Sequence, residues 1–553
     1  MAGSDKDEGG RKRVELDTLL VEEIGQFGRY QLRTFFLAMV LVVFIAWSNL
    51  EYVFTTARIS ARCVIPECEG GQPQEFSPPW LENAVPAGAS QGSFDSCQRF
   101  GNASGAARVV DSDTCPAALF DQDTRVPCED FVYENTNTVV YDYGLACDEW
   151  RRSLIGTVTT LGTFTALPLS GYISDRWGRR VALVFNGVNT AWIGILRYWA
   201  TSYLGFILLQ LVEATFGCGS YSSIYILLTE LVGPDYRVAI GAALKTCFAM
   251  GQVTLGLIAW CVPHWRTLTL TLYIPQFITI LYIWIICESV RWYMSKGRFE
   301  ESEALLKKVA KVNGKELSEK SLAALRCTAE ENIRVETEKH GGEDWLVMKV
   351  FRHKRVLIRC VVSPVWWITT TLIYYGLSLN AVNMSGNKYL NYIAVAAIEI
   401  PGFWTAYFLM DKIGRKPVLT GAFWLCAACQ GAYIFIPEGM YVASLLVYLT
   451  AKFCIAMVAT SVYVYTAELY PTCHRHSLFA FSSMMGRIGS MVAPLTPAFG
   501  AQFFPELPFV LFGSFALLSG ALIFLTPETL GTTLPDTMEQ ADNIGDKRFN
   551  AKK

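Results

Sequence analysis

The chain has 553 residues, of which 52% are hydrophobic and 17% are charged. A soluble protein carries about 25% charged residues, so this composition argues against a soluble globular protein. The net charge of −2 and the lack of a basic tract argue against a nucleic-acid partner.

Apolar windows of roughly 20 residues recur along the chain, and each is long enough to cross a bilayer as a helix. Six precede the middle of the chain and six follow it. They are 34–56, 153–173, 181–200, 202–228, 238–262, 266–286, 356–380, 390–410, 417–437, 440–466, 477–500 and 506–526. We therefore predict an all-α integral membrane protein with twelve transmembrane helices in two six-helix halves.

The polar segment 1–33 precedes an apolar window that is too long for a cleavable signal peptide. We expect this segment to stay in the cytosol. The short loops after the second and eighth windows are rich in Arg and Lys, and the positive-inside rule places them in the cytosol as well. An even number of spans then returns the tail 527–553 to the cytosol.

The segment 57–152 is a long insert after the first window, and it predicts an extracellular loop. Six cysteines lie in it, and an even cluster in an oxidising compartment indicates three disulfides. The spacing favours no particular pairing, and the lack of paired Cys-x-x-Cys motifs disfavours a zinc site. Asn102-Ala103-Ser104 is a predicted glycosylation site. The cysteines are Cys63, Cys68, Cys97, Cys115, Cys128 and Cys147.

The segment 288–355 is charged and rich in Ala, Leu, Lys and Glu. Helical periodicity over 300–312 and 317–338 predicts a cytosolic helical linker between the halves.

Two loop motifs occur once in each half of the chain. Asp175-Arg176-Trp177-Gly178-Arg179-Arg180 is repeated as Asp411-Lys412-Ile413-Gly414-Arg415-Lys416. Thr229-Glu230-Leu231 leading to Arg237 is repeated, at nearly the same offset, as Ala467-Glu468-Leu469 leading to Arg475. Two motifs at one offset indicate an internal duplication, which is the plan of a transporter built from two parallel halves.

The acidic and basic residues of these motifs predict ion-pair networks that close the cytosolic side and break when it opens. The alternative is that the basic residues only set the topology. The acidic partners and the repetition in both halves disfavour that alternative. The predicted gating residues are Asp175, Arg179, Arg180, Glu230, Arg237, Asp411, Arg415, Glu468 and Arg475.

The duplicated loops resemble those of the major facilitator superfamily. Three further features are similar to its organic cation, carnitine and organic anion transporter family: the cysteine-rich loop, Glu288-Ser289-Val290-Arg291-Trp292-Tyr293 and Tyr465-Thr466-Ala467-Glu468-Leu469-Tyr470-Pro471-Thr472. Pro527-Glu528-Thr529-Leu530-Gly531 also fits, whereas Cys287 stands where the family usually has Pro. The sugar-transporter branch shares several loops but lacks the cysteine-rich insert, so we place it second.

Five ionisable side chains fall inside apolar windows: Glu51, Glu213, Lys245, Glu399 and Arg487. Each costs free energy in a bilayer, so each needs an ion-pair partner or a function. The resemblance implies that Glu399 lines the central cavity, as in cation and carnitine carriers. It also implies that Arg487 acts as in carnitine- and anion-type members, since Arg can hold a carboxylate with two parallel hydrogen bonds.

Lys245 shares a helical face with Phe248 and Gln252. It could contact a substrate carboxylate or pair with Glu213. Glu51 lies near the outer end of its window, where it could meet an ammonium group; we favour contact with interfacial water.

Trp367 and Tyr374 are seven residues apart, hence on one helical face, and Tyr375 follows. Aromatic faces attract alkylammonium groups. By resemblance, Tyr221, Trp367, Tyr374 and Phe164 match cavity positions. Ordinary helix packing or an interfacial aromatic belt is the alternative.

We predict a monomeric, polyspecific plasma-membrane carrier that works by alternating access, without a catalytic site or a metal site. Its substrates would be small organic cations and zwitterions such as carnitine, betaines or β-alanine. Glu399 and the aromatic rings would take the ammonium end, and Arg487 with Lys245 the carboxylate. Coupling to Na⁺ or H⁺ is open. The alternatives are an organic anion exchanger and a non-transporting receptor on a carrier fold.

Overall fold

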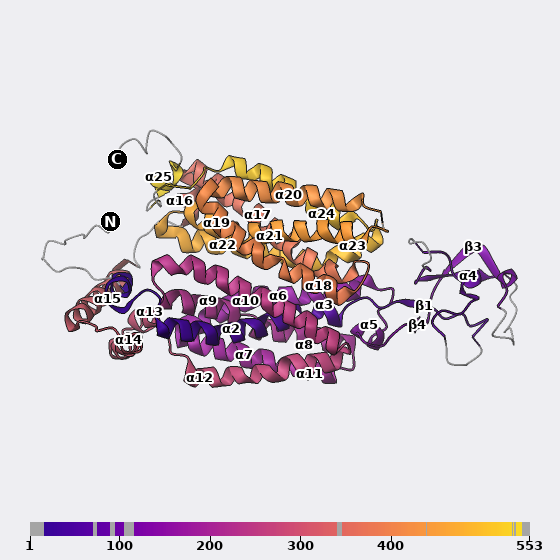
Figure 1. The fold of residues 1–553 in the computed structure, drawn as a ribbon, viewed down its shortest axis with the longest axis horizontal. Helices are drawn as coiled ribbons and strands as arrows, with labels where there is room; N and C mark the ends of the chain where they lie inside the picture. Colours follow the sequence, from indigo (N-terminus) through magenta and orange to yellow (C-terminus); the bar gives the residue numbers. More distant parts are fainter. Residues whose placement is uncertain are drawn as a thin grey trace.

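The computed structural model describes residues 16–69, 75–88, 94–103, 115–339, 346–437, 439–532, 535 and 538–544. Ten helical segments in this part of the chain are long and apolar enough to cross a membrane. α6 (Glu149–Trp177) and α7 (Arg179–Leu196) lie in the same bundle but are less apolar, because α6 is rich in threonine and α7 begins with two arginines (Figure 1). With these two, the fold has the twelve transmembrane helices predicted from the sequence.

The first half of the bundle comprises residues 29–55 and 149–285 and forms the lower layer of Figure 1. Several of its spans consist of two helical pieces in succession. Besides α6 and α7 it contains α2 (Arg29–Leu50), α3 (Tyr52–Thr55), η3 (Arg197–Trp199), α8 (Tyr203–Gly217), α9 (Ser220–Leu231), η4 (Pro234–Tyr236), α10 (Arg237–Cys261), α11 (Trp265–Tyr273), η5 (Ile274–Leu281) and α12 (Tyr282–Ile285).

The second half extends over residues 354–525 and forms the upper layer in orange and yellow (Figure 1). It contains α17 (Lys354–Asn380), η6 (Ala381–Asn383), α18 (Lys388–Ala397), α19 (Glu399–Ile413), α20 (Arg415–Ile434), α21 (Tyr441–Leu469), η7 (Thr472–His474), α22 (Arg475–Val492), η8 (Ala493–Leu495), α23 (Thr496–Gln502), α24 (Leu507–Leu522) and η9 (Ile523–Leu525).

One span of the second half is broken between α18 and α19. Pro401 has no backbone N–H to donate to the carbonyl of Ala397, the last residue of α18. The break places Glu399 at the first position of α19, a position on which the site described below depends.

The insert between α3 and α6 forms a small domain at one end of the bundle, seen on the right of Figure 1. It contains two antiparallel strand pairs, β1 (Ala61–Cys63) with β4 (Phe131–Tyr133) and β2 (Gln98–Asn102) with β3 (Phe120–Pro127). Short helices α4 (Leu81–Ala84), η2 (Ala117–Leu119) and α5 (Val139–Asp142) complete it.

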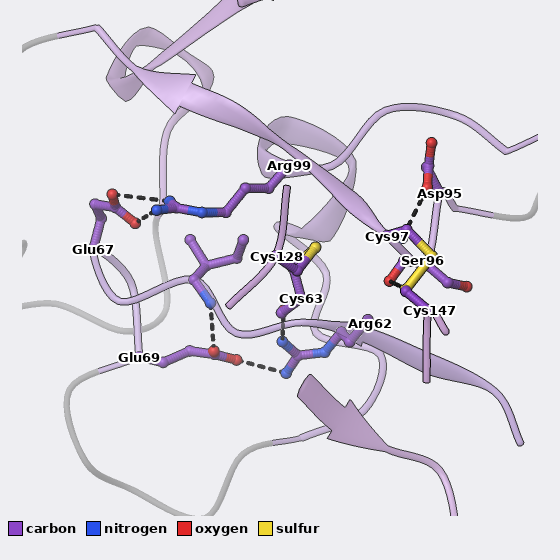
Figure 2. The surroundings of a disulfide bond; sticks show 11 residues. Arg62, Cys63, Glu67, Glu69, Asp95, Ser96, Cys97, Arg99, Cys128 and Cys147 are labelled. Carbon is purple, nitrogen blue, oxygen red and sulfur yellow. Dashed lines mark hydrogen bonds and ion pairs between the residues drawn. A yellow bond between two sulfur atoms is a disulfide. The ribbon is translucent and has the colours of Figure 1, made fainter. Parts of the chain in front are cut away.

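Its six cysteines pair as Cys63–Cys128, Cys68–Cys115 and Cys97–Cys147. Ion pairs between Arg62 and Glu69 and between Arg99 and Glu67 lie beside these disulfides (Figure 2). We call this part the disulfide domain and the end of the bundle that carries it the domain end. Asn102 is exposed at the end of β2, while Ser104 of its predicted glycosylation site lies outside the described residues.

Short helices gather at the opposite end, which we call the linker end (Figure 1). Leu305, Leu306 and Val309 of the linker pack against Leu19 and Leu20 from the start of the chain. This contact fixes the first described residues onto the linker. The helices are α1 (Leu16–Leu19), η1 (Leu20–Ile24), α13 (Val290–Ser295), α14 (Phe299–Asn313), α15 (Glu319–Lys339), α16 (Leu346–Arg352) and α25 (Met538–Asp542).

Candidate functional site

Glu399 lies at the start of α19 and is fully shielded from solvent. Lys452 of α21 forms an ion pair with it, with 2.9 Å between Nζ and Oε1. Oε2 accepts hydrogen bonds from the Tyr374 hydroxyl at 2.5 Å and from the Gln252 side-chain amide at 3.0 Å. Because Gln252 belongs to the first half, this network joins the two halves.

Lys452 is a residue that the sequence analysis missed. Its ammonium also donates to the Tyr374 carbonyl at 2.8 Å and to the Ser378 hydroxyl at 2.7 Å. It lies 3.8 Å from the centroid of the Tyr374 ring. In this conformation the carboxylate and the ring that were predicted to bind a substrate ammonium group therefore both hold the protein's own lysine. The available signal was a single lysine inside the long apolar helix α21.

Lys245 of α10 has no carboxylate partner among the described residues. Its ammonium donates to the carbonyl of Ala459 at 2.8 Å and lies 4.3 Å from the centroid of the Tyr463 ring, both in the second half. The alternative that Lys245 pairs with Glu213 is wrong, because Glu213 pairs with Arg197 at 3.6 Å.

Arg487 of α22 is half-buried, and within the described part of the chain its guanidinium makes neither a hydrogen bond nor an ion pair. α22 packs against α17 of the second half and against α6 of the first. Arg487 therefore lies on a helix between the two halves and carries an uncompensated positive charge.

Several of the predicted aromatic side chains contact one another, and one of their neighbours lies beside Lys245. The ring of Trp367 lies 4.6 Å from that of Tyr463, and its indole nitrogen donates to Thr466 at 3.1 Å. The rings of Tyr221 and Phe248 are 6.0 Å apart, and those of Tyr374 and Tyr375 are 5.4 Å apart.

Tyr463 was not predicted from the sequence either, although its side chain contacts several members of this aromatic cluster. It contacts Trp367, Phe479 and Lys245, and it is 41% exposed although it lies well inside α21. That exposure indicates open space between the halves. Phe164 is half-buried on α6 and takes part in none of these ring contacts.

The two remaining intramembrane acids, Glu51 and Glu213, lie away from this cluster and share Arg197. Our expectation that Glu51 reaches interfacial water is wrong, because its side chain is fully buried. The sequence analysis missed Arg197, which falls at the end of an otherwise apolar window.

Aromatic contacts join the two halves at the domain end. Phe54 lies 4.8 Å from Tyr392 and 5.7 Å from Tyr389 between ring centroids. Trp150 and Phe499 are 5.3 Å apart. The two halves are therefore in contact at the domain end, whereas the exposed Tyr463 lies nearer the linker end of α21.

The repeated loops form one ion-pair cluster in each half. Arg179 pairs with Asp175 at 2.9 Å and with Glu230 at 3.4 Å. Arg415 pairs with Asp411 at 3.3 Å and with Glu468 at 3.1 Å. Each cluster links helices of one half; a role in gating stays a prediction.

The other predicted gating residues lie near these clusters but make different contacts. Arg237 pairs with Asp17 at 2.6 Å, and Arg475 donates to the carbonyl of Tyr470 at 3.3 Å. Arg180 contributes its backbone N–H, which donates to Glu288 at 3.1 Å.

Two glutamates cap the helices that follow the repeated loops. This role was not predicted from the sequence. Glu288 accepts from the backbone N–H groups of Arg179 and Arg180, and Glu528 accepts from those of Arg415 and Lys416. A carboxylate at a helix N-terminus satisfies unpaired donors and interacts favourably with the helix dipole. Both glutamates lie in motifs that were recognised in the sequence. Their capping role could not be predicted, because the helix that each one caps is distant in the sequence.

The comparisons with known proteins agree with this architecture. Residues 126–540 match the family model described as sugar (and other) transporter. Two solved structures of the xylose transporter XylE have TM-scores of 0.54 and 0.55 at 18% and 16% identity; they cover 70% and 72% of this chain and 88% and 90% of their own. At that identity the likeness shows the major facilitator fold.

Curated relatives decide the family. Solute carrier family 22 member 2 of Pongo abelii is 30% identical over 430 residues, covering 77% of this chain and 76% of that protein. The chain belongs to the solute carrier 22 family. The organic cation transporter protein of Drosophila melanogaster is 27% identical, with 96% of this chain and 95% of its own covered. The human organic cation/carnitine transporter 2 is 28% identical, covering 94% and 92%.

This solute carrier is therefore a membrane transporter of the major facilitator superfamily and not an enzyme. Family membership leaves the cargo open, since the relatives are named as transporters of organic cations or of organic cations and carnitine, or by family number alone.

Proposed function

We propose that this transporter moves small organic solutes with a carboxylate or a similar anionic group across the plasma membrane. Arg487 and Lys245 bind the anionic group, and the rings of Tyr221, Phe248, Trp367, Tyr375 and Tyr463 contact the apolar body. The two halves rock about this cavity by alternating access, and the contacts at the domain end support an inward-facing state.

The observation that carries this proposal is the balance of charge between the halves. Glu399 has a lysine of its own, whereas Arg487 and Lys245 have no carboxylate among the described residues. A cavity with two uncompensated cations attracts an anion. Arginine binds a carboxylate through two parallel hydrogen bonds, and each hydrogen bond to a charged group contributes about 1.5–3 kcal/mol.

The same balance ranks the substrates: organic anions first, zwitterions second and simple cations last. A substrate ammonium group can reach Glu399 only by displacing Lys452, and breaking a buried ion pair costs about 3–5 kcal/mol. Zwitterions such as carnitine then bind through their carboxylate. This ranking reverses the order expected from the sequence, where Glu399 was free to bind an ammonium group.

We place the disulfide domain outside the cell and the linker with both chain termini in the cytosol. The disulfides support this orientation, because they persist in oxidising compartments. Glycosidase treatment should shift the apparent mass of the wild type and leave Asn102→Gln unchanged. A shift that persists in Asn102→Gln would place the glycan elsewhere.

Uptake by cells that express the transporter tests the proposed cargo. Labelled p-aminohippurate, carnitine and tetraethylammonium represent the anion, the zwitterion and the cation. We expect uptake in that order, with Arg487→Ala lowering kcat/KM for p-aminohippurate about 10- to 100-fold. Uptake of tetraethylammonium alone would contradict the proposal, and no flux of any of the three would favour a receptor function.

A further inference from the structure

A second buried charge cluster lies entirely in the first half of the bundle. Glu51, Arg197 and Glu213 are at most 2% exposed. Arg197 lies 2.6 Å from Oε2 of Glu51 and 3.6 Å from Oε2 of Glu213. Two carboxylates thus face one arginine, which leaves one negative charge without compensation if both acids are ionised.

The hydrogen bonds in this cluster are unevenly divided between the two acids. Glu51 accepts from Arg197, from the Thr269 hydroxyl at 2.5 Å and from the Tyr273 hydroxyl at 3.1 Å. Glu213 has only the Tyr273 hydroxyl at 3.4 Å within hydrogen-bonding distance of Oε1, and its Oε2 has no hydrogen-bond partner among the described residues. Because Tyr273 has one proton, it cannot donate to both carboxylates at once.

A proton on Glu213 resolves both imbalances. Oε1–H of Glu213 would donate to the Tyr273 oxygen, and the Tyr273 hydroxyl would donate to Glu51. The cluster would then carry no net charge. A buried carboxyl that lacks donors favours its neutral form for this reason. We propose that the Glu51–Glu213 pair binds one proton, held mainly on Glu213 and shared through Tyr273.

The surroundings favour a proton over a metal cation. Arg197 lies within 3.6 Å of both carboxylates and repels any second cation between them. It also donates to Gln210, whose buried side-chain nitrogen has no partner in the described part of the chain. The titratable and charged groups around the pair lie on η3, α8 and α11 and directly after the ends of α2, α5 and α8. They are Glu51, Arg197, Tyr143, Glu213, Cys218 and Tyr273.

This proton site is independent of the cargo proposed above.

Infrared spectroscopy of the full-length protein in lipid nanodiscs tests the site. The proton is the only ligand in this experiment. We expect the wild type at neutral pH to show the carbonyl band of a protonated, buried carboxylic acid, which shifts in D₂O and disappears in strong alkali. Glu213→Gln and Glu51→Gln should each lose that band, because one carboxylate then remains for one arginine.

Glu399→Gln is the matched control, since Glu399 already has one cation of its own and should be ionised. The band should persist in this variant. Absence of the band from the wild type, or its persistence in both Glu213→Gln and Glu51→Gln, would overturn the proposal. Loss of the band in Glu399→Gln alone would place the proton in the second half and also overturn it. Two independent glutamine variants keep the test valid if one of them fails to fold.

Discussion

In the second half of the bundle one carboxylate, Glu399, faces one lysine, whereas in the first half Glu51 and Glu213 share one arginine. The duplicated loops at the linker end repeat closely, but these buried clusters do not. The comparison shows that the duplication preserves the frame of the transporter, while the intramembrane charges diverge. The proposed substrate and proton sites both lie where the two halves diverge.

The largest effect should come from removing the cation of each cluster. With the proposed proton on Glu213, Arg197→Met leaves one ionised carboxylate, Glu51, without its cation, and Lys452→Met likewise leaves Glu399. Breaking one buried pair costs about 3–5 kcal/mol, so each variant should lose about that much. Thermal unfolding of the purified variants measures the loss.

Lys245→Met is the control for this pair, because it removes a lysine that has no carboxylate partner. It should change stability little. Lys452→Met combined with Glu399→Gln should recover most of the loss, since it leaves no uncompensated charge. A much larger loss in Arg197→Met than in Lys452→Met would mean that both acids of the first half are ionised, and would contradict the shared proton.

A smaller effect is expected at the glycines that begin the capped helices. Gly178 and Gly414 have φ values of 107° and 105°, where an alanine costs about 1–2 kcal/mol. A Cβ at Gly178 would overlap the Glu288 carboxylate, and one at Gly414 would lie 2.8 Å from that of Glu528. Gly178→Ala should therefore lower Tm more than Gly414→Ala does.

Gly171→Ala serves as the reference, because a Cβ there meets no atom within 4 Å and the residue lies inside α6. It should be neutral or slightly stabilising. A larger loss for Gly414→Ala than for Gly178→Ala would show that the carboxylate caps do not limit the space.

The smallest effect is a pH dependence of opposite sign at the two caps. Burial raises the pKa of Glu288, so its contribution to stability falls as pH rises above about 4.3, the pKa of an unfolded glutamate. Burial opposes ionisation of Glu528 too, but four backbone N–H donors lower its pKa. Its contribution is therefore lost as pH falls below about 4.3.

Tm measured against pH for Glu288→Gln and Glu528→Gln, each relative to wild type, separates the two caps. The Tm difference between Glu288→Gln and wild type should change above about pH 4.3, and that between Glu528→Gln and wild type should change below it. Differences of the same sign would mean that the caps are equivalent.

Much of the frame could be predicted from the sequence. Apolar windows give the spans because a bilayer allows few other structures, and repeated charges near Gly178 and Gly414 indicate the duplication. The pairing inside the bundle could not be predicted. Lys452 reaches Glu399 only because α19 packs beside α21, and Arg197 reaches Glu51 only because its long side chain extends from η3 to the first span. Such contacts depend on helix rotation, which hydrophobicity does not specify.

The Glu288 and Glu528 caps could be predicted only in part. Their motifs were recognised in the sequence, but a carboxylate that binds a helix N-terminus more than a hundred residues away leaves no local pattern.

The most direct test of the central claim compares one substrate with and without its negative charge. Binding of an aromatic carboxylate and of its carboxamide to the purified transporter should differ about 10- to 100-fold in Kd, in favour of the carboxylate. That preference should collapse in Arg487→Ala and fall in Lys245→Ala. Equal affinity of wild type for the two compounds, or an unchanged preference in Arg487→Ala, would contradict the account.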